Sequence, residues 1–173
     1  MTARRLPRGV VPEVPGPGQE SCWDYPRPPA LVRVVADIVV EFGGGVVAHA
    51  DHALVIKETS HPPTYYLAPE SWTGVLRPVS GMGTVCEWKG SARYLDVVGA
   101  DGVTIAPQAA WVYDQPWAPY TELARHISVY PGRMDRVTVE GELVRAQPGG
   151  FYGGWITDAV VGPFKGGPGS HGW

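Results

Sequence analysis

The sequence is short of several residue types that mark particular classes of protein. Its 173 residues include no asparagine, four glutamines, three lysines and two cysteines, and the formal net charge is −3. A general nucleic-acid-binding protein normally carries a basic face, and a membrane-spanning helix needs about 20 consecutive apolar residues, which this chain lacks. The basic N-terminus is followed by Pro12, Pro15 and Pro17 instead of the apolar stretch of a signal peptide. We therefore expect a cytoplasmic protein that binds neither membranes nor nucleic acids.

The cysteines and histidines are too few and too scattered to indicate a metal site. Cys22 and Cys86 lie 64 positions apart, and no Cys-x-x-Cys pair occurs. Among the five histidines only His49 and His52 are close, and their odd spacing on a strand would put them on opposite faces. Without a secretory signal, we expect two reduced thiols rather than a disulfide. The sequence therefore predicts no metal and no cofactor.

Glycine, proline and aromatic residues are abundant instead. The 23 glycines, 18 prolines, seven tryptophans and eight tyrosines predict many turns around an aromatic core rather than a helical bundle. Residues 149–169 combine glycines with Phe151, Tyr152, Trp155 and Phe164. We expect this segment to be ordered, because disordered tails contain few large aromatic residues. The prolines and the scarcity of amides would suit a thermostable protein, and a GC-rich codon bias would give the same composition.

The pattern of apolar residues predicts a mostly β fold. Residues 1–19 show no periodicity and are expected to form a flexible arm, followed by a single domain over residues 20–173. Strands are expected over residues 32–42, 46–50, 52–58, 84–88 and 92–98, with a turn at 43–45 and hairpins at Asp101-Gly102 and over 137–145. Short helices are expected over residues 107–111 and 120–126. We predict a compact antiparallel β-sandwich or open barrel with one or two short helices.

Five separated blocks of sequence point to a family. They are residues 23–29, 58–66, 86–90, 109–111 and 149–169. On these blocks the chain resembles the bacterial DUF427 family, a domain of unknown function. The resemblance implies a small, mostly β bacterial protein similar in fold to the β-tent group, whose zinc-binding members carry paired Cys-x-x-Cys knuckles. The family has also been labelled nucleotidyltransferase-like, but this chain lacks the carboxylate cluster that two-metal phosphoryl transfer requires.

His61 and Cys86 are candidates for chemistry. Two prolines follow His61 and fix the backbone there, so its imidazole could act as a general base or contact a ligand. The alternative is a histidine that caps a local turn. Cys86 could be an activated nucleophile or a small buried hydrophobe. Strand alternation puts Cys86 and Trp88 on one face and Lys89 on the other.

Two of the three lysines lie inside the family blocks. Because arginine is the usual cation of this chain, Lys89 and Lys165 stand out as groups that could bind phosphate or carboxylate. The alternative is an ion pair with Glu87 or Glu58. Aromatic residues predicted to wall an apolar pocket are Tyr65, Trp88, Trp111, Tyr113, Tyr152 and Trp155.

Three functions remain open at this level. The first is a monomeric domain that binds a small polar or anionic ligand in the aromatic pocket, oriented by His61, Lys89 and Lys165 together with Tyr65. The second is an enzyme with His61 as general base and with Cys86 or Lys89 in support. The third is a protein-interaction module that uses the proline-rich residues 7–29 as a peptide ligand.

Overall fold

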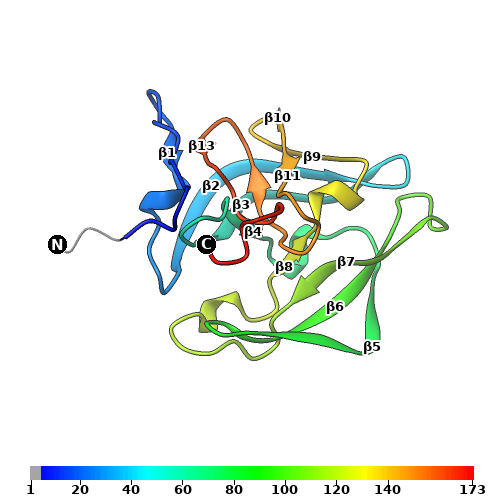
Figure 1. Ribbon diagram of the computed structural model, residues 1–173. Helices are drawn as coiled ribbons and strands as arrows, with labels where there is room; N and C mark the ends of the chain where they lie inside the picture. The colour runs from blue at the N-terminus through cyan, green and yellow to red at the C-terminus, as the bar shows by residue number, and fades with distance from the viewer. Residues whose placement is uncertain (1–4) are drawn as a thin grey trace.

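Two stacked antiparallel β-sheets form the framework of the structure, with the cyan strands above the green ones in Figure 1. The computed structural model describes residues 5–173. One sheet has the strand order β10-β9-β2-β3-β4, and the other has the order β5-β6-β7-β8. The strands of the first sheet are β2 (Ala30–Glu41), β3 (Val46–Lys57), β4 (Thr64–Tyr66), β9 (Arg136–Val139) and β10 (Glu142–Leu143). Those of the second are β5 (Leu76–Cys86), β6 (Gly90–Val98), β7 (Ile105–Val112) and β8 (Ile127–Val129).

Short elements complete the chain. Four short strands form two further pairs. β1 (Glu20–Ser21) pairs in parallel with β13 (Val160–Val161), and β11 (Arg145–Ala146) pairs in antiparallel fashion with β12 (Trp155–Ile156). The 3-10 helices are η1 (Cys22–Asp24), η2 (Pro69–Ser71), η3 (Thr121–Leu123) and η4 (Pro131–Arg133). No helix among the described residues is both long and apolar enough to cross a membrane.

The long hairpin of β2 and β3 follows directly from the sequence. β-Branched and other apolar residues dominate β2, and such residues pack well on a pleated surface. Gly43 and Gly44 adopt φ angles of 66° and 83°, which residues with a Cβ atom rarely adopt. These two glycines allow the chain to reverse there into β3. This predicted turn is confirmed, and so are the hairpins at Asp101-Gly102, between β6 and β7, and at Gly141, between β9 and β10.

The helical predictions are only partly confirmed. The described residues contain four 3-10 helices of three residues each and no α-helix. The helix expected over residues 107–111 is wrong, because these residues lie in β7 and pair with β6 and β8. Ala109 to Val112 are all buried there, and a continuous apolar run of this length does not distinguish a buried strand from a buried helix. Of the expected helix 120–126, η3 retains only residues 121–123.

The main core lies between the two sheets. Ile38 and Val40 of β2 and Val97 of β6 are completely buried and belong to one apolar cluster. An antiparallel bridge between Leu67 and Ile127 joins the β4 edge of one sheet to the β8 edge of the other. The predicted fold class is thereby confirmed: the protein is mostly β, with an open antiparallel sandwich as its framework.

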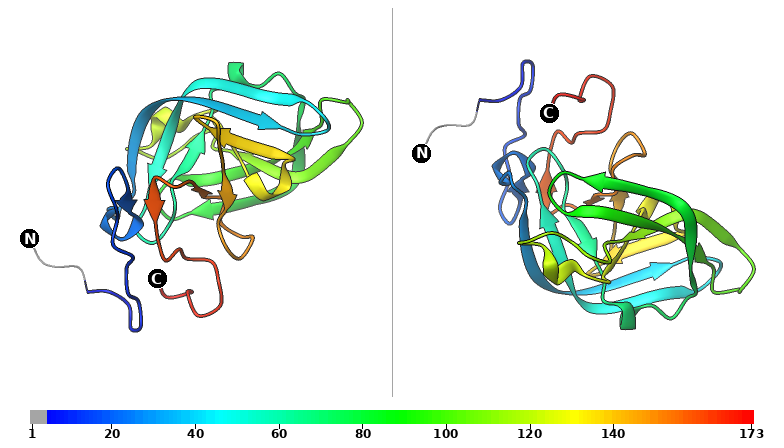
Figure 2. Two further views of the ribbon diagram at one scale, coloured as in Figure 1. Left: turned by 90° about the horizontal axis from the view of Figure 1, so that it is seen from above. Right: turned by 90° about the horizontal axis from the view of Figure 1, so that it is seen from below.

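The N-terminal segment packs against the C-terminal segment, as the blue and red parts of Figures 1 and 2 show. The main-chain N–H of Glu13 donates to the carbonyl of Gly162 at 2.9 Å. Val10 is buried in a cluster with Trp23 and Val160. Part of the segment that we expected to be a flexible arm therefore contacts the rest of the protein, and residues 1–4 of that arm lie outside the described residues.

Candidate functional site

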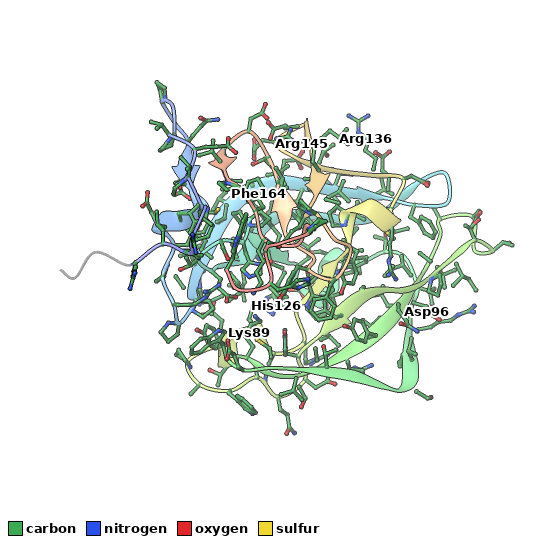
Figure 3. The ribbon with its side chains drawn as sticks, viewed as in Figure 1. Lys89, Asp96, His126, Arg136, Arg145 and Phe164 are labelled. Atoms are coloured by element: carbon green, nitrogen blue, oxygen red, sulfur yellow. The ribbon has the colours of Figure 1, made fainter. Side chains whose placement is uncertain are left out.

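One cavity gathers most of the predicted site residues. Its volume is about 470 Å³, and it is lined by the β3–β4 loop, the β5–β6 hairpin, β7 and residues 147–153. The predicted residues in its wall are His61, Cys86, Trp88, Lys89, Trp111, Tyr113, Tyr152 and Lys165. Figure 3 places Lys89 toward one end of the β5–β6 hairpin and Asp96 toward the other. The cavity thus lies at the end of the hairpin where the chain turns from β5 into β6.

Two predicted pocket residues, Tyr65 and Trp155, lie outside this cavity wall. Their rings stack on each other with centroids 4.9 Å apart, and Trp155 is completely buried in the main core. Because side chains alternate along a strand, the neighbouring Tyr66 faces the other way and lines the cavity. The structure therefore puts Tyr66 where the sequence led us to expect Tyr65.

The loop that carries His61 is fixed by main-chain hydrogen bonds. The N–H of Ser60 donates to the carbonyl of Cys22 at 3.1 Å, and the N–H of Lys165 donates to the carbonyl of Ser60 at 2.8 Å. Within the loop, the N–H of His61 donates to the carbonyl of Glu58 at 3.0 Å. These hydrogen bonds fix the main chain around His61 in the loop between β3 and β4.

Gln147 binds the imidazole of His61 through a hydrogen bond of 2.9 Å between Nε2 of Gln147 and Nδ1 of His61. The main chain fixes the orientation of this amide. Its Oε1 accepts from the N–H of Gly154 at 3.0 Å, and its Nε2 donates to the carbonyl of Lys165 at 2.8 Å. A main-chain N–H can only donate and a carbonyl can only accept, so the amide nitrogen must face His61. Nδ1 is therefore the acceptor, and the neutral ring carries its proton on Nε2.

The surroundings of His61 keep its ring neutral. Burial lowers the pKa of His61 from its ordinary value of 6.5 to about 4. The Glu58 carboxylate opposes this shift in the pKa of His61. The charges of Lys165, Arg27 and Lys89 are the smaller causes that lower the same pKa, and the value of about 4 includes their effect. With its Nδ1 lone pair engaged and three cations near it, His61 is better suited to donate a hydrogen bond from Nε2 than to act as a general base.

Lys89 lies beside Cys86 in the cavity wall. The expectation that the two occupy opposite faces is wrong, because β5 ends at Cys86 and residues 87–89 form the turn into β6. The turn brings the Lys89 amino group back to the Cys86 thiol, with which it interacts. Burial lowers the pKa of Lys89, but interactions with Tyr66, Cys86 and Glu58 outweigh burial, and the net shift is upward. The amino group therefore stays protonated although the residue is only 7% exposed.

The Glu58 carboxylate, which lines the same cavity, is already paired. Glu58 accepts a hydrogen bond from Nε of Arg27 at 3.1 Å. Among residues 5–173, Lys89 makes no ion pair within 4 Å, so the ion pair that we considered as its alternative role is not formed. Lys165 donates to the main-chain oxygen of Trp173 at 3.0 Å and lies 5.5 Å from the centroid of the Tyr152 ring.

The aromatic side of the cavity is held together by its polar atoms. Nε1 of Trp111 donates to the hydroxyl of Tyr66 at 3.2 Å, and the rings of Tyr66 and Tyr113 lie with their centroids 6.2 Å apart. Trp88 differs, because its Nε1 is buried and has no hydrogen-bond partner in the described part of the chain. An unpaired buried donor is costly, and this one belongs to a residue of the cavity wall.

Sequence reasoning missed three residues of this site. Tyr66 was overlooked because the sequence does not reveal which face of β4 the cavity occupies. Arg27 lies inside a family block but was not singled out. Gln147 lies outside the five blocks, and its only signal is that this chain has four glutamines and no asparagine.

The fold and the cavity define a mostly β protein with a half-open cavity whose wall is rich in aromatic residues and carries cations. A family model described as a domain of unknown function (DUF427) matches residues 30–140, and the chain belongs to this family. No curated protein matches the chain. The matched region contains His61 and Lys89, whereas Gln147 and Lys165 lie beyond it. Within residues 5–173, no group of three or more His, Cys, Asp or Glu side chains could hold a metal ion.

Proposed function

We propose that this protein binds a small organic anion in the cavity. The observation that carries the proposal is the Lys89 ammonium, which is buried in the wall without an acidic partner within 4 Å among the described residues. Burying a charge is costly unless an opposite charge or hydrogen bonds compensate for it. Around the ammonium lie the Cys86 thiol, which is a weak acceptor, and the Tyr113 ring, whose centroid is 5.7 Å away, whereas Glu58 is paired with Arg27. An anionic ligand would add a direct opposite charge to these weaker interactions.

The shape and chemistry of the wall support the same proposal. A volume of about 470 Å³ falls within the range of pockets that hold small molecules. Trp111 and Tyr130, whose ring centroids are 4.7 Å apart, form part of an apolar wall on which a flat ligand could stack. Lys165 adds positive charge at the His61 end of the cavity, where the charges of Arg27 and Glu58 are paired with each other. A planar body with an attached carboxylate or phosphate fits this combination.

A thermal-shift screen tests the proposal. The wild type, Lys89→Met and Lys57→Met would each be screened with aromatic carboxylates, nucleotides, sugar phosphates and neutral aromatic amides. Lys57 is the matched control because it pairs with Glu20 at 2.7 Å and lies outside the cavity wall. A ligand at 100 times its dissociation constant stabilises the folded state by about 2.7 kcal/mol.

We expect at least one anion to raise the melting temperature of the wild type and of Lys57→Met, and to raise that of Lys89→Met much less. If the neutral amides gave the larger shifts, or if Lys89→Met responded like the control, the proposal would be overturned.

An enzyme remains the second candidate because the Cys86 thiol and the Lys89 ammonium are neighbours in the cavity wall. In this enzyme hypothesis Cys86 is the nucleophile, Lys89 is the electrostatic stabiliser, and His61 has no role as a base. The test is acyl transfer from 4-nitrophenyl acetate to the thiol, followed as nitrophenolate release by the wild type, Cys86→Ser and Cys22→Ser. A nucleophilic Cys86 would lose its burst of product in Cys86→Ser alone, and an equal slow release by all three proteins would contradict it.

The interaction-module hypothesis is less favoured. A peptide ligand has to be accessible to its partner, but within residues 7–29 the side chains of Val10, Trp23 and Tyr25 are buried against the domain.

A further inference from the structure

We infer that Gln147 holds His61 as a fixed hydrogen-bond donor, and that this donor makes the cavity select ionised oxyanions over isosteric amides. The inference rests on the proposed function, since it assigns a ligand group to the same cavity. Gln147 is thereby a positioning residue, and the cavity has a preference between ligand classes that neither the sequence nor the family match indicates.

The first step is the rigidity of the Gln147 amide. Rotating it by half a turn would place Oε1 against the carbonyl of Lys165 and Nε2 against the N–H of Gly154, so both hydrogen bonds would be replaced by repulsion. The residue is only 4% exposed, so water cannot compensate readily. The amide nitrogen is thus held toward Nδ1 of His61.

The second step is the consequence for the imidazole. A proton on Nδ1 would face the N–H of Gln147 at a separation of 2.9 Å between the nitrogens, so this form is disfavoured. Lys165, Arg27 and Lys89 disfavour the doubly protonated ring for an independent electrostatic reason, although Glu58 favours it. The ring therefore presents only a donor at Nε2, and no hydrogen bond from Nε2 to another described residue competes with a ligand.

The third step is the balance of donors and acceptors around the cavity. Lys89 and Lys165 have ammonium groups, which only donate, and the Glu58 carboxylate in the same wall is already paired with Arg27. A carboxylate or a phosphate offers only acceptors and satisfies such a set. The NH₂ group of an amide of the same shape would place donor against donor. The selected ligand class is a flat apolar body that carries an ionised oxyanion.

The first experiment needs no ligand. Nitrogen NMR of the His61 ring in the wild type, at pH values from about 5 to 8, reports which ring nitrogen carries the proton. We expect a protonated Nε2 and an unprotonated Nδ1 throughout this range, unchanged in the exposed-glutamine control Gln115→Met. A protonated Nδ1 in the wild type would overturn the inference, whatever the protein binds.

The second experiment measures selectivity by calorimetry with phenylacetate, phenyl phosphate and phenylacetamide as probes. Gln147→Glu replaces the donor facing Nδ1 by an acceptor and should move the ring proton to Nδ1. Gln147→Met removes the hydrogen bond to His61 but keeps a side chain of similar length. It therefore separates the loss of this hydrogen bond from a folding defect caused by the added charge of Gln147→Glu. The carboxylate and the phosphate are separate arms, and tighter binding of either one identifies which oxyanion the cavity accepts.

We expect the wild type and Gln115→Met to bind one of the two anions at least about tenfold more tightly than the amide, and Gln147→Glu to lose most of this preference. Gln147→Met should retain an intermediate preference, because Nδ1 and Nε2 then compete for the proton. Equal binding of anion and amide by the wild type would overturn the selectivity rule but not the presence of a ligand site. If no anion bound while the NMR result stood, the proposed function would fail and the positioning of His61 by Gln147 would remain.

Discussion

Trp155 stacks on Tyr65 with the two ring planes inclined by 16°, on the side of β4 that faces away from the cavity. Nε1 of Trp155 donates to the carbonyl of Val129 at 3.0 Å, so this indole is satisfied both by packing and by hydrogen bonding. Trp88 in the cavity wall shows the opposite condition, because its buried Nε1 has no partner among the described residues. The two tryptophans therefore differ in what their indole nitrogens contribute to the folded state.

This difference predicts that the same substitution has a large effect on stability at Trp155 and a small effect at Trp88. Trp155→Phe should lower the free energy of unfolding by about 2–4 kcal/mol, because it leaves the Val129 carbonyl unpaired and opens a cavity in the core. Trp88→Phe removes an unsatisfied donor and should change the free energy of unfolding by less than about 1 kcal/mol. Urea unfolding followed by circular dichroism would measure both. A Trp88→Phe variant as unstable as Trp155→Phe would contradict this account of the cavity wall.

The contact between Gly153 and Trp111 gives a second prediction. A Cβ added to Gly153 would overlap the Trp111 ring, which lines the cavity. Gly153→Ala should therefore displace the ring or the 149–153 loop, cost about 1–3 kcal/mol of stability, and weaken binding of any anion found by the screen. Gly167→Ala is the matched control, since its added Cβ meets nothing within 4 Å. Equal melting temperatures for the two variants would show that the loop yields without cost.

The two cysteines should differ in reactivity. Cys22 is completely buried, and burial raises the pKa of its thiol to about 12. Cys86 is only partly buried and lines the cavity. Iodoacetamide at about pH 8 should therefore label Cys86 first, which peptide mass spectrometry would show. A bound anion should slow this labelling, and preferential modification of Cys22 in the folded protein would be inconsistent with the structure.

His61 makes stability depend on pH. Its pKa is about 4 in the folded protein and near 6.5 when the chain is unfolded. Between these values the unfolded chain binds more protons, so the free energy of unfolding decreases as pH falls from about 6.5 toward 4. The loss should reach about 2 kcal/mol at pH 4.5, since one pKa unit corresponds to about 1.4 kcal/mol.

The variant His61→Gln isolates this contribution to the pH dependence. The difference in unfolding free energy between the wild type and His61→Gln should shift with pH by the amount given above, in ligand-free buffer. The other titrating groups are common to both proteins and cancel in the difference. A difference that stays constant from pH 7 to pH 4.5 would mean that His61 is not buried as a neutral ring.

The strands and turns could be predicted well from the sequence. The β2–β3 hairpin depends on a run of β-branched residues and on glycines with positive φ, both of which are local properties. The wrong prediction of a helix over residues 107–111 arose from a non-local property instead. These residues become a strand because β6 and β8 pair with them on both sides, and that pairing depends on residues distant in the sequence.

The candidate site could be predicted only in part. Rare lysines and aromatic blocks led to Lys89, Lys165 and Trp111, all of which the fold brings to one cavity. The error between Tyr65 and Tyr66 arose because alternation along a strand shows that neighbours face opposite ways, but not which face borders the cavity.

By itself, the sequence determined the β character of this protein, its tight turns and the residue types available for a site, because these depend on local backbone preference and side-chain chemistry. Only the tertiary structure decided that Gln147 meets His61 across 86 positions of sequence, and that Lys89 turns back beside Cys86. Such contacts depend on how two sheets and a glycine-rich C-terminal segment pack together. The charge, the tautomer and the donor geometry of the site are consequences of that packing.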